Sequence, residues 1–186
     1  ILSGSTQSFS SNEELWVMQV DENGDDIWEK TYGGLDDDKG ILIEEIPSGD
    51  FILVGQTQSS IQDNGENILI AKLDSTGTEA WLTEVGGRGD KIANSFCSLK
   101  DVRNGFIIIG ELKTTDAQSK ILMVKINQRG KIIWERTYGG NYISYGCSVK
   151  DDGSRLVVMG NHDIDSNGNS EIILFKTDYD GLLLNN

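Results

Sequence analysis

The sequence of 186 residues contains little of what several common functions need. His162 is the only histidine, and no second base or nucleophile stands at a recognisable position, so no serine, cysteine or zinc catalytic constellation can be assembled. Only 16 basic residues stand against 30 acidic ones, and the resulting net charge of −14 would repel a phosphate backbone. The sequence therefore argues against these hydrolase classes and predicts that nucleic acid is not a partner.

Long apolar runs and proline are also scarce. The apolar segments are short, such as FIII at 106–109, and none approaches the roughly 20 residues that a membrane helix needs, so no membrane span is expected. Pro47 is the single proline, whereas 22 glycines and 37% apolar residues indicate a folded, turn-rich chain. Cys97 and Cys147 occupy different places in the repeat described below, which favours two thiols and leaves one disulfide as the alternative.

An internal repeat organises the chain. The segment WEKTYGG at 28–34 returns as WLTEVGG at 81–87 and WERTYGG at 134–140, a spacing of 53 residues, and a fourth copy begins at Gly181. That copy has Asn185 in place of tryptophan. We expect four repeats, at about 1–34, 35–87, 88–140 and 141–186, within one domain that starts at Ile1 as a mature or truncated form. The first repeat lacks its leading segment.

The repeat predicts an all-β fold. Each unit holds short segments rich in β-branched and aromatic residues, separated by Asp, Asn and Gly clusters that leave no room for helices. Runs such as FILVG and ILMVKI are almost continuously apolar, so both faces of each sheet must be covered. A β-propeller of about four four-stranded antiparallel blades satisfies this requirement, with about 15 strands in all. Such a partial ring could be closed by oligomerisation, for example as a homodimer.

The motifs resemble the tryptophan–Gly-Gly (WxxxYGG) β-propeller repeats of secreted and surface proteins of bacteria and archaea. The likeness includes WEKTYGGLDDD, the strands FILVGQT, FIIIGEL and LVVMGNH that contain a glycine, and the segments IAKLDSTG, MVKINQRG and LFKTDYDG. It covers nearly the whole chain. The resemblance implies a scaffold in an extracellular or cell-surface setting, and it implies no reaction.

Two features are candidates for ligand binding. Trp28, Trp81 and Trp134 would either stack on a sugar ring or, as we expect, pack between blades at equivalent, largely buried sites. The loop HDIDSNGNSE places oxygen donors on alternate residues before a glycine, as in the opening of a calcium loop. Its candidate metal ligands are Asp163, Asp165, Asn167 and Glu171, with calcium as the cofactor, and a solvated polar loop is the alternative.

These observations predict a non-catalytic extracellular propeller that presents a protein-binding or glycan-binding, adhesive surface. No catalytic residues are assigned. The alternative is a carbohydrate-active enzyme in which two of the many carboxylates act as acid and base across a channel, as in glycoside hydrolysis. A third possibility is a spacer without a small ligand. Two carboxylates that converge in one cleft would favour the enzyme.

Overall fold

The computed structural model describes residues 1–59, 65–100, 105–115, 118–140, 143–165 and 169–184, and these residues form fourteen strands and no helix. The chain divides into two compact units, residues 1–88 and 89–186, which are described separately. In the described part of the chain no helix is long and apolar enough to cross a membrane. The predicted all-β class is confirmed.

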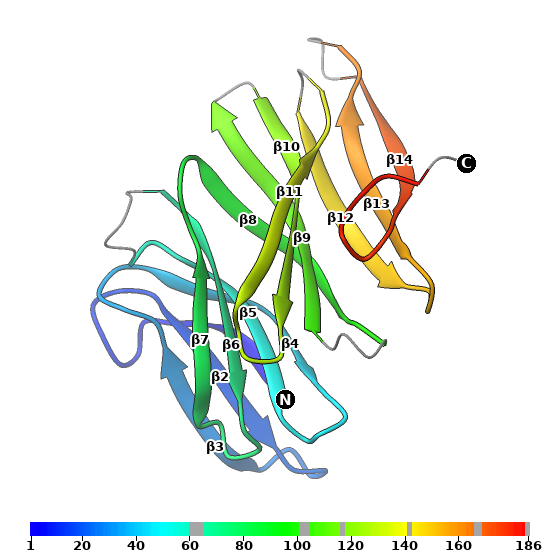
Figure 1. Cartoon of the computed structure of the whole chain (residues 1–186). Coiled ribbons are helices and arrows are strands. Elements are labelled where there is room, and N and C mark those ends of the chain that lie inside the picture. The colour runs from blue at the N-terminus through cyan, green and yellow to red at the C-terminus, as the bar shows by residue number, and fades with distance from the viewer. Residues whose placement is uncertain (60–64, 101–104, 116–117, 141–142, 166–168, 185–186) are drawn as a thin grey trace. The chain divides into compact units, whose positions relative to one another are not determined.

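Unit 1 contains two antiparallel sheets whose strands follow chain order (Figure 1). Sheet A consists of β1 (Leu2–Thr6), β2 (Glu14–Val20) and β3 (Asp26–Tyr32). Sheet B consists of β4 (Asp38–Glu45), β5 (Phe51–Thr57), β6 (Asn67–Leu73) and β7 (Glu79–Val85). Sheet A thus lacks the leading strand that sheet B has, as the sequence predicts.

Unit 2 also contains two antiparallel sheets in chain order. Sheet C consists of β8 (Asp90–Ser98), β9 (Gly105–Thr115), β10 (Gln118–Asn127) and β11 (Ile132–Tyr138). Sheet D consists of β12 (Ser144–Asp151), β13 (Leu156–Asp163) and β14 (Ser170–Thr177). The expected fourth strand of sheet D is reduced to a single bridge between Thr177 and Leu183. The described residues therefore form two four-stranded and two three-stranded sheets, with fourteen strands rather than the 15 or so expected.

In each unit the two sheets bury an apolar core between them. In unit 1, Leu15 and Val17 of sheet A pack in one cluster with Phe51, Leu53 and Leu69 of sheet B. In unit 2 the cluster joins residues of sheet C to residues of sheet D, among them Ile107, Ile109, Ile121, Met123, Val149, Leu156 and Val158. A fully buried aliphatic side chain contributes about 1.5–3 kcal/mol, so face-to-face packing is the main stabilising term and accounts for the continuous apolar runs.

The third and fourth strands of a repeat are joined by a turn. The side chain of the first turn residue accepts hydrogen bonds from backbone N–H groups of the same turn. In β6–β7 the Oδ1 atom of Asp74 accepts hydrogen bonds from the backbone N–H groups of Thr76 and Thr78, at 2.8 and 2.9 Å. Gly77 has a φ of 73°, which favours glycine. The same arrangement occurs at Asp21, Asn127 and Asp178. The predicted hairpin turns capped by Asp or Asn are confirmed.

The repeated tryptophan motif binds the turn of the following sheet. In unit 1, Trp28 on β3 donates its indole N–H to the carbonyl oxygen of Ser75 at 3.2 Å, and the Tyr32 hydroxyl donates to the carbonyl of Gly77 at 2.6 Å. Ser75 and Gly77 belong to the turn between β6 and β7. The motif is therefore a clamp between two sheets.

Unit 2 repeats the same contacts. Trp134 on β11 donates its indole N–H to the carbonyl of Tyr179 at 3.2 Å, and the Tyr138 hydroxyl donates to the carbonyl of Gly181 at 2.6 Å. These carbonyls belong to the turn that follows β14, at the positions equivalent to those in unit 1. The two full copies of the motif have the same structural role.

A cation between the two aromatic residues makes the third contact of the clamp. Lys30 Nζ donates to the carbonyl of Thr76 at 2.9 Å, and Arg136 Nε donates to the carbonyl of Asp180 at 2.6 Å. Three side chains on alternate residues of one strand, which share a face, thus satisfy three successive carbonyls of one turn. This explains why the chain writes W-x-K/R-x-Y twice.

The packing interpretation of the tryptophans is confirmed for Trp28 and Trp134, which pack against the two core clusters. These two residues and Trp81 all have intermediate exposure. The indole N–H groups of Trp28 and Trp134 reach turn carbonyls at the rim of the core. Cys97 and Cys147 are both free thiols and half-buried, as favoured above.

Candidate functional site

One face of β9 changes from apolar to polar along its length. Ile107 and Ile109 lie on the face directed toward sheet D and are fully buried in the core of unit 2. Glu111 and Lys113 continue the same face, because strand residues two apart point the same way. The packed interface between sheets C and D therefore gives way at one end to charged side chains.

A cleft of about 530 Å³ opens at this polar end. Its lining comes from the start of β8, the end of β9, the start of β10 and the segment before β12. The lining residues are Gly89, Asp90, Glu111, Lys113, Thr114, Gln118, Ser119 and Ile143. Two carboxylates, one ammonium group, one amide and two hydroxyls thus surround one space.

The backbone around the cleft is held by close contacts. Gly89 has a φ of 87°, and a Cβ atom there would lie 2.3 Å from the carbonyl oxygen of Lys113, so only glycine lets β8 begin this close to β9. On the other side Ser119 exchanges two hydrogen bonds with the backbone of Ser144, each at 3.1 Å. These contacts tie β10 of sheet C to β12 of sheet D beside the cleft.

A serine–histidine contact lies next to the cleft. The Oγ atom of Ser144 is 2.7 Å from Nδ1 of His162 on the neighbouring strand β13. Ser144 is fully buried, with 0% of its surface exposed, so its hydroxyl cannot attack a substrate from solution. The pair serves to join β12 to β13, and it is not a nucleophile and its base.

A second cavity of about 390 Å³ shares Glu111 with the first and is otherwise lined by Asn94, Tyr145 and Cys147. Asn94 on β8 and Cys147 on β12 are each the extra residue of a β-bulge. The two bulges are equivalent, because β8 and β12 are the first strands of sheets C and D. Asn94 donates its side-chain N–H to the carbonyl of Gly146 at 2.9 Å, which links sheets C and D. The two cavities together join polar groups to one aromatic ring.

The residues of the cleft provide both hydrogen-bond donors and hydrogen-bond acceptors. Asp90 and Glu111 accept hydrogen bonds, Lys113 donates them, and Gln118 does both. Tyr145 is half-buried and lines the second cavity together with Glu111, the residue that the two cavities share. Hydroxyl-rich ligands need mixed donors and acceptors next to an aromatic surface. The chemistry of the cleft therefore fits a sugar better than a purely apolar ligand.

The predicted calcium loop is only partly within the described residues. Asp163, Asp165 and Glu171 are described, whereas Asn167 lies outside them. Asp165 accepts hydrogen bonds from the backbone and side-chain N–H groups of Asn169, at 3.3 and 2.7 Å. Among the described residues no three His, Cys, Asp or Glu side chains are grouped to hold a metal ion. Calcium at this loop stays a prediction.

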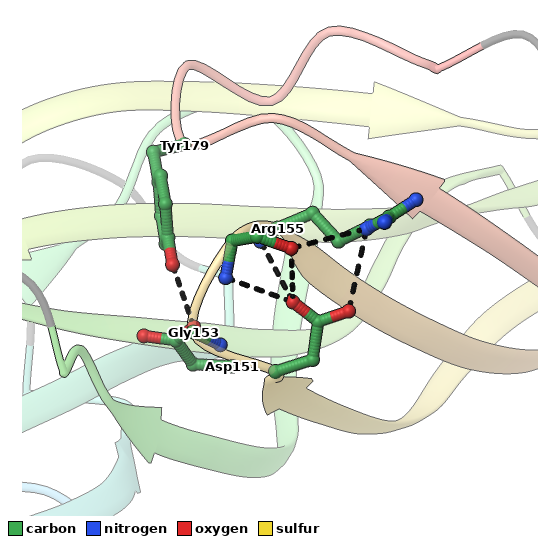
Figure 2. A network of polar contacts seen from close by, with 6 residues as sticks. Asp151, Gly153, Arg155 and Tyr179 are labelled. Atoms are coloured by element: carbon green, nitrogen blue, oxygen red, sulfur yellow. Dashed lines mark hydrogen bonds and ion pairs between the residues drawn. The ribbon is translucent and has the colours of Figure 1, made fainter.

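A buried polar network around Asp151 in unit 2 is structural. Asp151 at the end of β12 accepts hydrogen bonds at 2.7 Å from the Tyr179 hydroxyl and from Gly153 N–H (Figure 2). The backbone N–H of Lys100 donates a third hydrogen bond, also at 2.7 Å. Burial raises the pKa of Asp151, but the hydrogen bonds from Lys100, Tyr179 and Gly153 outweigh burial and hold that pKa below its ordinary value. Both carboxylate oxygens are occupied, so Asp151 is not available to a ligand.

Beside it, Asp152 closes the turn between β12 and β13. Its carboxylate accepts hydrogen bonds from Ser154 and from the backbone N–H of Arg155, and Arg155 Nε lies 3.3 Å from Asp152 Oδ2 (Figure 2). The Ser154 hydroxyl, followed by its backbone N–H, holds the pKa of Asp152 below its ordinary value despite the opposing effect of burial. This turn is locally satisfied and offers no acceptor to a substrate.

Comparisons with known proteins add no relative. No family model matches the chain, and no curated protein matches it significantly. The sequence signal that would have pointed to the cleft is the segment FIIIGELK, in which an apolar strand becomes charged without a turn.

Proposed function

We propose that this chain is a non-catalytic β-propeller scaffold of the tryptophan–Gly-Gly type, placed outside the cell or on its surface, that binds a glycan in the cleft at the polar end of sheets C and D. The single observation that carries the proposal is the cleft itself, in which Asp90, Glu111, Lys113 and Gln118 surround about 530 Å³. A protein surface is the second class of ligand for the same scaffold.

The blade interpretation is supported by how the sheets pack. Each unit stacks two antiparallel sheets face to face, and the same three clamp contacts recur in both units. A repeated sheet that buries both of its faces against equivalent sheets is the packing rule of a propeller. Closure of the sheets into a ring is part of the proposal.

The binding test uses the whole chain on a glycan array, followed by calorimetry with each glycan that binds. Glu111→Gln keeps the side-chain volume and removes one charged acceptor from both cavities. A hydrogen bond to a charged group contributes about 1.5–3 kcal/mol, so the affinity should fall by at least about tenfold.

Glu45→Gln, at an exposed position at the end of β4 in unit 1, is the matched control and should bind as the parent does. If no glycan binds, or if both variants bind equally well, the cleft is not a glycan site. Binding of a surface protein that Glu111→Gln leaves unchanged would move the ligand site elsewhere on the chain.

One observation favours the alternative enzyme. Asp90 and Glu111 line the same cleft, and two carboxylates are the groups that most glycoside hydrolases use. Release of reducing ends from a bound glycan, abolished by Glu111→Gln, would establish hydrolysis. If a bound glycan is recovered intact after long incubation, the chain acts as a binding protein.

A further inference from the structure

The outward face of sheet D is apolar and exposed. Met159 on β13 is 41% exposed, while Ile172 and Leu174 on β14 are 79% and 68% exposed. Met159 pairs with Leu174 in the register of the two strands, so their side chains lie on one face. These three residues define the front face of sheet D. A cluster of exposed aliphatic side chains on a folded chain marks an interaction site.

The equivalent face is buried wherever a sheet follows within the same unit. The aligned positions in sheet C are Ile109 for Met159, Ile121 for Ile172 and Met123 for Leu174. All three are 0% exposed, in the core shared with sheet D. In sheet A, Leu15 and Val17 align with Ile172 and Leu174 and are also 0% exposed, in the core shared with sheet B. The front face of sheet D therefore carries aliphatic residues at the positions that form buried interfaces in sheets A and C.

Both buried interfaces seat an aliphatic side chain against a glycine. A Cβ atom at Gly55 in sheet B would lie 2.5 Å from Cδ1 of Leu15, and one at Gly160 in sheet D would lie 2.8 Å from Cδ1 of Ile121. Neither glycine tolerates a side chain while the sheets stay in place. Leu15 and Ile121 occupy the repeat position of Ile172, so Ile172 requires a glycine opposite it.

The rear face of sheet A offers that glycine. Gly4 aligns with Gly55 and Gly160, and the nearest atom to a Cβ placed there is Cε3 of Trp16 at 4.0 Å. Leu2, 52% exposed, pairs with Met18 beside it, and Gly4 pairs with Trp16, so these four residues share one face and define the rear face of sheet A. The seat at Gly4 is open.

We propose that the front face of sheet D binds the rear face of sheet A of a second copy of this chain, with Ile172 seated against Gly4. The contact is heterologous, because it joins two different surfaces, and a dimer can make it twice. Sheet D of one copy and sheet A of the other would then pack face to face in the way that the two sheets inside each unit do. The inference does not depend on the ligand-binding function proposed above.

Charge supports the same pairing. Across sheets C and D, Lys125 Nζ donates to the carbonyl of Tyr179 at 3.0 Å. Lys176 stands at the position of Lys125 on sheet D, and Glu22 stands at the position of Tyr179 in the turn after β2. In the proposed contact Lys176 therefore meets a turn that carries the acidic residues Asp21 and Glu22, just as Lys125 meets a turn that carries Asp178 and Asp180.

The test is the mass of the purified chain by light scattering over a wide concentration range. We expect a mass that rises from 20.5 kDa to twice that value. Ile172→Asp, at an exposed position that should leave folding intact, should raise the dissociation constant by at least about tenfold, because it places a carboxylate in an apolar contact. Leu35→Asp, at a site 88% exposed and away from both faces, is the matched control.

A second variant separates this contact from other modes of association. Gly4→Val fills the seat, and its Cβ would lie 4.0 Å from the nearest atom, Cε3 of Trp16, so the chain should fold and fail to dimerise. Mixing Ile172→Asp with Gly4→Val leaves one intact contact per pair and should restore association between the two variants, provided the contact is heterologous. A constant 20.5 kDa mass, an Ile172→Asp chain that associates as the parent does, or a mixture that stays monomeric overturns the proposal.

Discussion

The hydroxyl of Tyr138 provides the sharpest test of the clamp. It donates to the carbonyl of Gly181 at 2.6 Å, and Gly181 is buried. Tyr138→Phe removes that single oxygen and keeps the ring, so packing against Phe175 at a centroid distance of 5.1 Å should survive. One net hydrogen bond contributes about 1 kcal/mol, and a buried acceptor left without it costs more, so we expect a loss of about 1–2 kcal/mol in the free energy of unfolding.

The same hydroxyl makes stability depend on alkaline pH. Burial, with a smaller contribution from Asp178 and against the lowering effect of Arg136, raises the pKa of Tyr138 to about 12. An unfolded tyrosine titrates near pH 10, so the folded state holds its proton more tightly. The contribution is fully present below pH 10 and is lost as the pH rises toward 12. Tyr138→Phe should therefore flatten this part of the stability curve.

Two measurements distinguish a stabilising hydrogen bond from Tyr138 to the turn from a tyrosine hydroxyl that is only exposed to solvent. Urea unfolding at pH 7 gives the free-energy difference, and hydrogen exchange followed by mass spectrometry locates it. Exchange should increase at the backbone N–H groups of Gly181 and Leu182, which close the clamped turn. Tyr32→Phe is the internal replicate, because its hydroxyl donates to Gly77 and the effect should appear at that turn. A change in unfolding free energy below about 0.3 kcal/mol, with exchange unaltered at both turns, would refute the clamp.

Three further predictions address the buried carboxylate, the calcium loop and a glycine. Because hydrogen bonds lower the pKa of Asp151, its contribution is present above about pH 4 and is lost as the pH falls through the folded value, so acid unfolding of Asp151→Asn should show a weaker pH dependence than the parent between pH 4 and 2. Millimolar calcium should raise the melting temperature, and Asp165→Asn should abolish that rise; identical melting in calcium and chelator removes the metal hypothesis. Gly110→Ala, whose Cβ would lie 1.8 Å from the carbonyl oxygen of Ile92, should lower the free energy of unfolding by about 3 kcal/mol or more, whereas Gly4→Ala should be nearly neutral in the same urea titration.

Much of the fold can be predicted from the sequence because it rests on local chemistry. The turn at 74–77 needs an Asx residue to accept backbone N–H groups and a glycine at positive φ, and Asp74 and Gly77 stand three residues apart in the chain. The repeat then copies that turn at intervals of 53 residues from Asp21 to Asp74 and Asn127, and of 51 residues from Asn127 to Asp178. The sheet faces follow from apolar runs alone. Such features can be predicted from the sequence because the residues that interact lie within a few positions of each other in the chain.

The cleft is less predictable because its residues meet only through the fold. Asp90 and Gln118 start different strands, and Ile143 precedes a third, so no spacing in the sequence brings them together. The function of the tryptophan motif was hidden for the same reason, since the partner of Trp28 lies 47 residues away. The candidate calcium site includes Asn167, which lies outside the described residues, so calcium binding at this loop stays a prediction from the sequence.

The second copy of the motif shows which of its positions belong to the clamp. WLTEVGG keeps Trp81 but has Thr83 where the full copies have a lysine or arginine, and Val85 where they have tyrosine. Threonine cannot supply a long cationic donor, and valine has no hydroxyl; Val85 is instead 1% exposed and acts as a core residue. The altered copy lies just before Arg88, the last residue of unit 1, whereas both full copies join sheets inside a unit. The 53-residue period thus keeps the tryptophan in all three copies, whereas the cation and the tyrosine occur only in the two copies that join sheets inside a unit.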